Sequence, residues 1–148
     1  GTDQTACRGD SVNIGASPAA NGNASPFTYI WTPSSGLSFD TVPTPKASPS
    51  SSTGYLLTVT DSKGCTSNDI VTVVIYQLPI PKIKPDNLTV ACDGSYSVVL
   101  TSSEAEEYLW STSATTQAIT VSTEGNYFVT VTDANGCSGV STLINAIK

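Results

Sequence analysis

Histidine and methionine are absent from the 148 residues, and only 12% of the residues are charged. Histidine is the commonest general base and the commonest metal ligand, so its absence argues against most hydrolytic and zinc-dependent chemistry. The net charge is −6, and the six basic residues are scattered, which leaves no basic surface for nucleic acid. We therefore expect a protein that is not an enzyme, needs no cofactor and does not bind nucleic acid.

Long apolar runs are also missing. The longest, Val73–Tyr76, has the length of a short strand, whereas a membrane-spanning helix needs about 18 apolar residues. No basic segment followed by an apolar stretch marks a leader at the N-terminus. We interpret the chain as a monomeric segment of a longer polypeptide, without membrane insertion, whose neighbouring domains are its first partners.

The sequence does contain an internal repeat. Tyr55–Cys65 aligns without gaps on Tyr127–Cys137, and seven of the eleven positions are identical. Two further blocks repeat upstream in the same order: Tyr29–Thr32 with Tyr108–Ser111, and Cys7–Ile14 with Cys92–Leu100 after one insertion. Ordered self-similarity of this kind indicates two homologous modules in tandem.

The boundary between the modules lies in a proline-rich stretch, Gln77–Pro85. Three prolines in so short a segment favour an extended and stiff connector over a flexible one. The predicted domains are therefore residues 1–78 and residues 82–148.

Strand patterns dominate both modules. Valine, isoleucine, threonine and tyrosine alternate with period two, and glycine, proline, asparagine and aspartate interrupt the alternation every 8–12 residues. Serine and threonine make up 42 of the 148 positions, which suits the solvent-facing side of half-buried antiparallel strands. The sequence predicts an all-β chain of two tandem β-sandwiches.

Two aromatic positions in each module resemble those of the immunoglobulin-like sandwich. A tryptophan on the third strand (Trp31 and Trp110) and a tyrosine opening the sixth (Tyr55 and Tyr127) match that pattern, and all four are expected in the core. The cysteines depart from it, because they stand before the second strand and after the sixth instead of within them.

This variant resembles the Ig-like, PKD-like repeats of Bacteroidetes-type bacteria, which occur in gliding-motility adhesins and in modular polysaccharide-degrading proteins. The segments that support the resemblance are Cys7–Val12, Trp31–Ser38, Pro45–Cys65, Trp110–Gln117 and Tyr127–Cys137. The resemblance implies a secreted, cell-surface protein in which the modules are spacers, display elements or adhesive segments, and it supplies no catalytic residues.

Each module owns two cysteines, so the expected disulfides are Cys7–Cys65 and Cys92–Cys137, in an oxidising compartment. The pairing depends on strand number. The two cysteines of a module meet at one end of the sandwich only if an even number of strands runs from the second strand through the sixth. Because sixteen residues separate Trp110 from Tyr127, we expect four strands there. Five long strands would separate the sulfurs by a strand length.

Two aspartates are weak candidates for a Ca²⁺ site. Asp61 and Asp133 open the turns that lead to Cys65 and Cys137, and carboxylates are ligands that Ca²⁺ accepts. Their spacing is not that of an EF-hand loop, and stabilisation of the turn is the simpler interpretation, so no metal is assigned. The glutamates of segment 104–107 are interpreted as a solvated loop rim.

Carbohydrate binding is the alternative function, as an accessory module of a polysaccharide-degrading enzyme. Stacking on a sugar needs exposed aromatic rings, and the aromatics outside the repeated core positions include Phe27, Tyr96 and Phe128. An exposed strip formed by these three rings would favour this alternative over a spacer.

Overall fold

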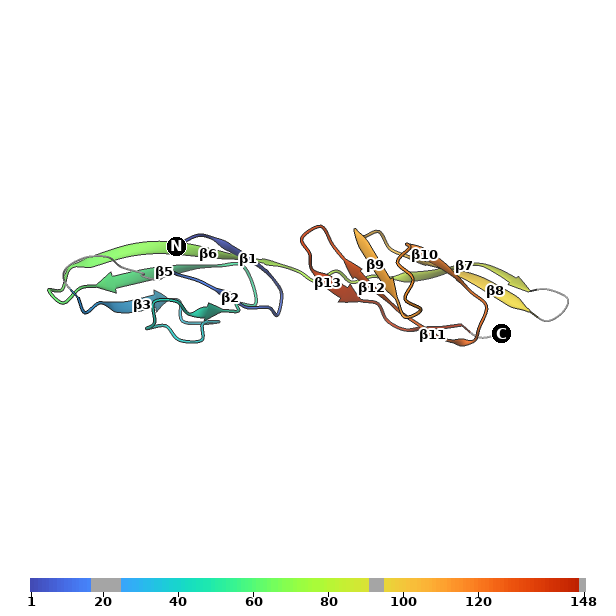
Figure 1. The fold of residues 1–148 in the computed structure, drawn as a ribbon, viewed down its shortest axis with the longest axis horizontal. Helices are drawn as coiled ribbons and strands as arrows, with labels where there is room; N and C mark the ends of the chain where they lie inside the picture. Colours follow the sequence, from blue (N-terminus) through green and yellow to red (C-terminus); the bar gives the residue numbers. More distant parts are fainter. Residues whose placement is uncertain (17–24, 91–94, 147–148) are drawn as a thin grey trace. The chain divides into compact units, whose positions relative to one another are not determined.

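The computed structural model describes residues 1–16, 25–90 and 95–146, with the backbone alone at 87–90. Every regular element among these residues is a strand, so the predicted all-β class is confirmed (Figure 1). None of them forms a helix with the length and hydropathy of a membrane span. The chain divides into two compact units, Gly1–Gln77 and Leu78–Lys148, which we call module 1 and module 2.

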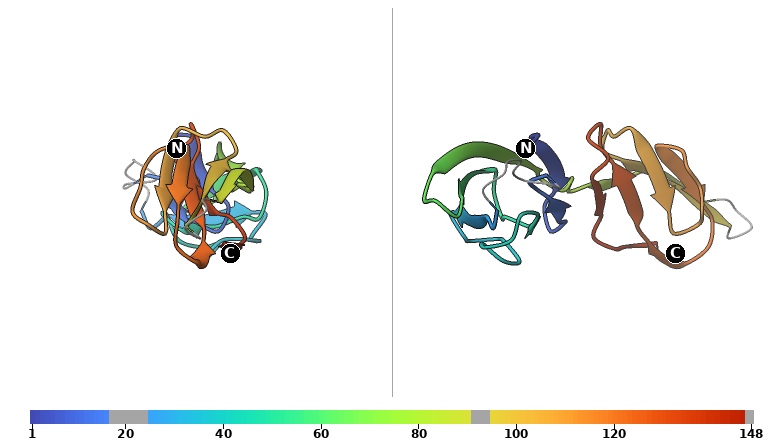
Figure 2. Two further views of the ribbon diagram at one scale, coloured as in Figure 1. Left: turned by 90° about the vertical axis from the view of Figure 1, so that its right-hand side faces the viewer. Right: turned by 60° about the vertical axis from the view of Figure 1, so that its left-hand side comes forward.

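Module 1 is a sandwich of a four-stranded and a two-stranded sheet. The larger sheet has the order β1-β6-β5-β3 and the smaller pairs β2 with β4. Its strands are β1 (Gln4–Cys7), β2 (Val12–Asn13), β3 (Thr28–Thr32), β4 (Lys46–Ala47), β5 (Thr53–Thr60) and β6 (Thr66–Tyr76). The first strand runs parallel to the last, β6, which arches over the shorter strands in the right-hand view of Figure 2.

Module 2 is also built of packed β-sheets, but its strands are divided among the sheets differently. One sheet has the order β10-β8-β7, another the order β13-β12-β9, and β11 pairs with β14. The strands are β7 (Ile83–Val90), β8 (Tyr96–Ser102), β9 (Glu107–Trp110), β10 (Ala118–Val121), β11 (Gly125–Tyr127), β12 (Val129–Thr132), β13 (Ser138–Val140) and β14 (Ile144–Ala146). Both modules are Ig-like β-sandwiches, as the strand patterns and the resemblance at the tryptophan and tyrosine positions predict.

Period-two alternation places one face of each strand in a core. Successive residues of β8 alternate between buried and half-buried positions, and β5 buries Tyr55 and Leu57 while Leu56 between them is exposed. Both tryptophans and both repeat tyrosines are buried, each in the core of its own module. The remaining fully buried core residues are aliphatic for the most part, among them Ile14, Val71, Val73, Leu100, Val129 and Val131.

The buried polar atoms of these aromatics are satisfied by irregular backbone. The Trp31 indole N–H donates to the Val42 carbonyl at 2.9 Å, and that of Trp110 donates to the Thr116 carbonyl at 2.8 Å. An unpaired buried donor would cost about 1–3 kcal/mol, so these bonds fix the segments that follow β3 and β9. In module 1 the Trp31 backbone N–H also donates to the Asp40 carbonyl at 2.8 Å.

The segment after β3 adds a pass across module 1 that the sequence pattern did not predict. Four strands, β2 to β5, do run from the second to the sixth Ig-like position, as expected. Between β3 and β4, however, Leu37 forms an antiparallel bridge to Ala47, and the Ser38 N–H donates to the Lys46 carbonyl at 2.8 Å. Residues 37–40 therefore act as an irregular fifth strand. The number of passes from the second to the sixth Ig-like strand is then odd, whereas the predicted cysteine pairing needs an even number.

Part of the proline-rich connector is fixed to module 2. Pro81 is buried, and the Ser103 N–H donates to the Lys82 carbonyl at 2.9 Å. A Cβ placed on Gly139 of β13 would lie 1.8 Å from the Pro79 carbonyl oxygen, so only glycine lets the connector approach there. On the other side, Arg8 of module 1 binds both Tyr76 and Gln77.

Substituting alanine for Gly139 should therefore destabilise module 2. We expect Gly139→Ala to lower the free energy of unfolding by about 1–3 kcal/mol, because the connector backbone must move away from the new methyl group. Each module contains one tryptophan, so urea unfolding followed by tryptophan fluorescence reports on both.

Gly54 of β5 is the matched control, since nothing lies within 4 Å of a Cβ added there. Gly54→Ala should be neutral or stabilise by about 0.4–1 kcal/mol, because it restricts the unfolded chain. Equal losses in both variants would contradict the packing of Pro79 on Gly139.

Candidate functional site

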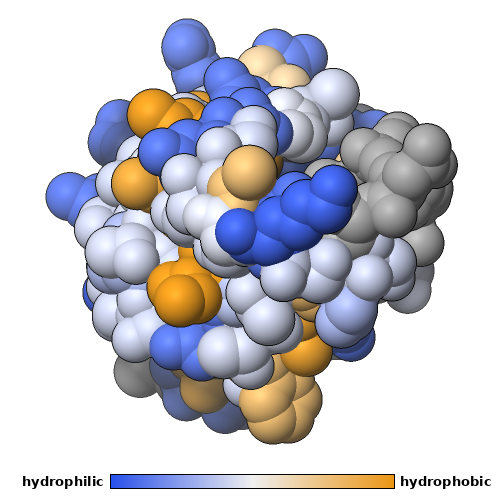
Figure 3. Space-filling model, turned by 90° about the vertical axis from the view of Figure 1, so that its left-hand side faces the viewer, coloured by the Kyte–Doolittle hydropathy of each residue, from blue (hydrophilic) through white to orange (hydrophobic). Residues whose placement is uncertain are grey.

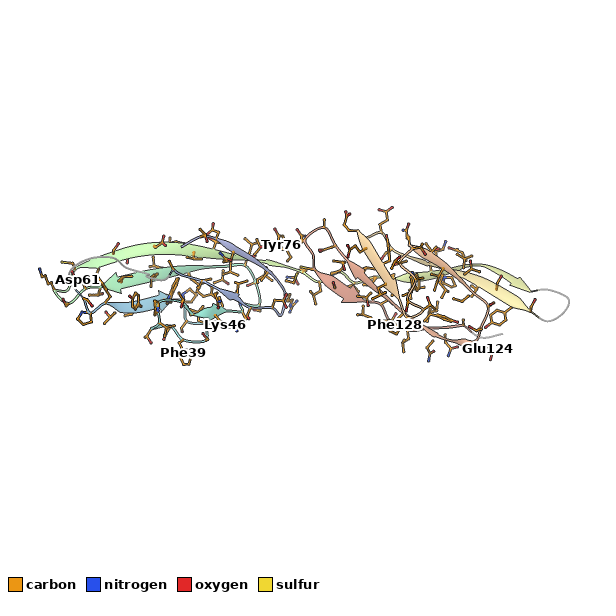
Figure 4. All side chains as sticks on the ribbon, viewed as in Figure 1. Phe39, Lys46, Asp61, Tyr76, Glu124 and Phe128 are labelled. Carbon is orange, nitrogen blue, oxygen red and sulfur yellow. The ribbon has the colours of Figure 1, made fainter. Side chains whose placement is uncertain are left out.

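The turn that follows the sixth Ig-like strand has the same geometry in both modules. Asp61 Oδ1 accepts hydrogen bonds from the backbone N–H groups of Lys63 and Cys65, at 2.9 and 2.8 Å. In module 2 the Asp133 Oδ1 accepts from Asn135 and Cys137, both at 2.9 Å. Figure 4 labels Asp61 at the tip of module 1.

Both aspartates are thus engaged by their own turns. A left-handed glycine closes each turn, Gly64 with φ 84° and Gly136 with φ 78°, a conformation that side chains with a Cβ rarely adopt. Among the described residues, no three His, Cys, Asp or Glu side chains gather closely enough to hold a metal ion. These contacts explain Asp61 and Asp133 as turn-stabilising residues.

The cysteines depart from the predicted pairing. Cys7 and Cys137 are each disulfide-bonded, whereas Cys65 carries a free, exposed thiol. The predicted Cys7–Cys65 disulfide is therefore wrong. Its counterpart Cys92–Cys137 involves Cys92, which lies outside the described residues.

The sheet of module 1 explains this error. Cys7 is in register with Tyr76, the last residue of β6, whereas Cys65 directly precedes Thr66, the first. The ends of this eleven-residue strand are about 33 Å apart at about 3.3 Å per residue, and a disulfide needs Cα atoms within about 7 Å. Asp61 and Tyr76, labelled in Figure 4, mark the two ends of the module.

The three candidate sugar-binding aromatics do not form an exposed strip. Tyr96 is only 8% exposed, and burial, with a contribution from the charges of Glu124 and Tyr127, raises the pKa of its phenol above the ordinary value of 10.0. Phe27 is half-buried in module 1. Phe128 is the exposed ring of the three, on the outer face of module 2, whereas Tyr96 is buried, so the strip that would have favoured carbohydrate binding is not formed.

Both modules instead expose aliphatic or aromatic side chains on an outer sheet face. In module 1 Leu56 of β5 lies directly opposite Ile70 of β6, and Ile30 of β3 is a diagonal neighbour. All three are exposed although each belongs to a strand whose alternate residues are in the core.

The corresponding face of module 2 is similar. Leu109, Thr130 and Val140 are in register across β9, β12 and β13, and Phe128 lies two residues before Thr130. Leu109 and Phe128 stand at the repeat positions of Ile30 and Leu56. We call these surfaces the outer faces; apolar residues in outward positions of the alternation are the signal by which the sequence could have revealed them.

A groove of about 320 Å³ lies at the turn end of module 1. Its walls combine apolar and acidic side chains, including Phe27, Leu57, Val59, Asp61, Cys65 and Asp69. On the face shown in Figure 3, hydrophobic side chains form separate spots among hydrophilic ones. The groove therefore offers polar and apolar contacts side by side, and Asp61 in its wall is already engaged by the turn.

Sequence comparisons give no relative, since no family model and no curated protein matches the chain. Solved structures do match over most of its length. They include an amphioxus IgVJ-C2 molecule, with 9% identity, 97% of this chain and 99% of that chain covered, and a TM-score of 0.39. The Ig1-2 module of the Drosophila receptor protein tyrosine phosphatase DLAR has 12% identity, coverage of 97% and 93%, and a TM-score of 0.35.

A bacterial structure is also similar. SGBP-B of a Bacteroides ovatus mixed-linkage glucan utilisation locus, solved with a mixed-linkage heptasaccharide, has 14% identity and a TM-score of 0.34. The match covers 99% of this chain and 43% of that one, so the chain spans less than half of its length. With identities and TM-scores this low, the Ig-like assignment rests on the strand arrangement described above, and no role is transferred.

Removing an aspartate from one turn tests its assigned role. Asp133→Ala should lower the stability of module 2 by about 1–2 kcal/mol, because two backbone N–H groups lose a carboxylate acceptor. Asp133→Asn, which keeps an acceptor oxygen, should lose less. Chemical denaturation measures both, and an increase in thermal stability of the unaltered protein on adding Ca²⁺ would contradict the turn-only role.

Proposed function

We propose that the chain is a non-catalytic pair of extracellular Ig-like modules that spaces or displays other parts of a larger secreted or cell-surface bacterial protein. Residues 1–78 and 82–148 are the proposed modules. The disulfide-bonded cysteines support an oxidising location, and the self-contained core of each module supports autonomous folding.

The contacts of the connector are the observation on which this proposal rests. Tyr76 and Gln77 are bound by Arg8 on one side, and Pro79 packs on Gly139 on the other. Leu78 is thus the short remainder between a segment fixed to module 1 and a segment fixed to module 2. A connector with so few free backbone torsions restricts how one module can turn against the other. A spacer needs this restriction, and a flexible tether lacks it.

Stiffness of the connector is measurable by ¹⁵N relaxation of the full chain. A stiff connector predicts that the two modules tumble with one shared correlation time. This should hold both with the disulfide intact and after a reductant has cleaved it. Replacing both Pro79 and Pro81 by glycine should give each module a shorter correlation time of its own, because the two most constrained residues of the connector are lost.

Pro49→Gly, in a loop within module 1, is the control and should leave the shared correlation time unchanged. Independent tumbling in the unaltered chain would overturn the spacer proposal.

A second candidate function, carbohydrate binding, is favoured by Phe128 on the outer face of module 2. Phe128 is 36% exposed, and Leu109 and Val140, which pair with Thr130, are its diagonal neighbours, so an apolar sugar face has a surface on which to stack. Phe128 is the one aromatic ring among the residues named on this face, and a single ring offers little surface for stacking on a glycan.

A glycan array decides between the two functions. Under the second candidate, the chain binds a polysaccharide, and Phe128→Ala abolishes the binding. Phe39 is a matched control because it is 68% exposed and projects from a loop of module 1 (Figure 4), so Phe39→Ala should leave such binding intact. The spacer proposal alone predicts no glycan signal for any of the three proteins.

A further inference from the structure

The last strand of module 1, β6, is paired along only part of its outer edge. Its inner edge pairs with β5 over residues 66–73, whereas β1 covers the outer edge at residues 73–76 alone. In the part of the chain that the structure describes, no other strand pairs with β6. Residues 66–72 therefore present an open sheet edge, and such an edge is a template on which another polypeptide can add a strand.

One contact shows which backbone groups line this open edge. The Thr72 N–H donates to the carboxylate of Asp3 at 2.8 Å, on the side of β6 that faces away from β5. Backbone groups of a strand point to its two edges alternately, so every second residue before Thr72 turns its N–H and C=O the same way. The open edge thus carries the N–H and C=O groups of Asn68 and Ile70.

The groove described above lies beside this edge. Residues 66–69 of β6 form part of its wall, and its apolar side chains include Phe27, Leu57 and Val59. Val71 and Val73 point into the core and are fully buried, whereas Asp69, the preceding residue of that inward series, is exposed. The sandwich is therefore open at this end of β6, and a strand added there turns alternate side chains into the groove.

The charged side chains of the groove are both acidic. Asp61 is engaged by its turn, whereas Asp69 is half-exposed and binds the amino group of Gly1. A carboxylate in this position favours a basic side chain on the added strand. A second copy of the chain is disfavoured, because pairing β6 with its own copy would bring two Asp69 carboxylates near each other.

We propose that the open edge of β6 and the groove beside it form a docking site for an extended segment of another polypeptide. The segment pairs as a strand with the backbone of Asn68 and Ile70. It places a basic side chain against Asp69 and buries apolar side chains beside Phe27 and Val59. Backbone pairing supplies affinity in this arrangement, and the alternate side chains supply specificity.

A synthetic heptapeptide tests the site on the full chain of residues 1–148. The probe is acetylated and amidated and alternates threonine with valine, with lysine in place of the central valine, so that lysine and both valines share one face. We expect it to slow amide hydrogen exchange at Asn68 and Ile70. The amides of Ser67 and Asp69 should change little, because they point toward β5. Unchanged exchange at Asn68 and Ile70 in millimolar peptide would overturn the proposal.

The basic residue of the partner is tested separately. Replacing the lysine of the peptide by glutamate should weaken binding about fivefold, as expected for loss of an exposed ion pair. Asp69→Asn should remove this preference. Asp10→Asn is the matched control, because Asp10 is exposed and follows Cys7 at the opposite end of β6, so this variant should keep the preference. Equal binding of both peptides to the unaltered protein would overturn the assigned chemistry of the partner.

Methylation of the peptide N–H groups separates strand pairing from simple surface contact. A strand turns alternate N–H groups to opposite edges, so methylating one alternate set should abolish binding and methylating the other should leave it intact. The same effect from both sets would overturn strand addition. Dimerisation of the chain without peptide, if it slowed exchange at Asn68 and Ile70, would overturn the choice of another polypeptide as the occupant.

Discussion

Each module buries one tryptophan whose indole N–H must find an acceptor inside a core that is otherwise almost entirely apolar. The acceptor is a carbonyl of the irregular segment that follows the tryptophan strand, Val42 for Trp31 and Thr116 for Trp110. Satisfying this donor holds an irregular stretch of chain across the open side of the sandwich. In module 1 this irregular stretch supplements a very short second sheet, in which β2 and β4 pair over two residues each.

The irregular segment after the tryptophan strand also separates the two cysteines of module 1. Because residues 37–40 cross module 1 as an additional pass, the chain reaches the start of β6 at the end far from Cys7. The two cysteines of module 1 are therefore not bonded to each other, and Cys65 keeps a free, exposed thiol. Sandwiches of this size bury a smaller fraction of their surface than larger domains, so the buried aromatic residues and their hydrogen bonds weigh heavily in their stability.

The repeat and the strand alternation were sufficient to predict the fold class and the burial of Trp31, Trp110, Tyr55 and Tyr127. The role of the turn aspartates also followed from local sequence, because an Asx turn is formed within five residues. The cysteine pairing did not, since it depends on whether an irregular segment counts as a strand. Tyr96 was misjudged because its place near a turn suggested exposure, whereas the alternation of β8 turns its ring inward.

The parallel pairing of β1 with β6 has a mechanical consequence. Gln4 pairs with Val73 and Cys7 with Tyr76, so a pull on the two ends of module 1 draws these strands in opposite directions along their length. The hydrogen bonds between them then bear the load together, in shear, instead of opening one after another as they would in a peeled hairpin. A module built in this way resists tension through its terminal strands.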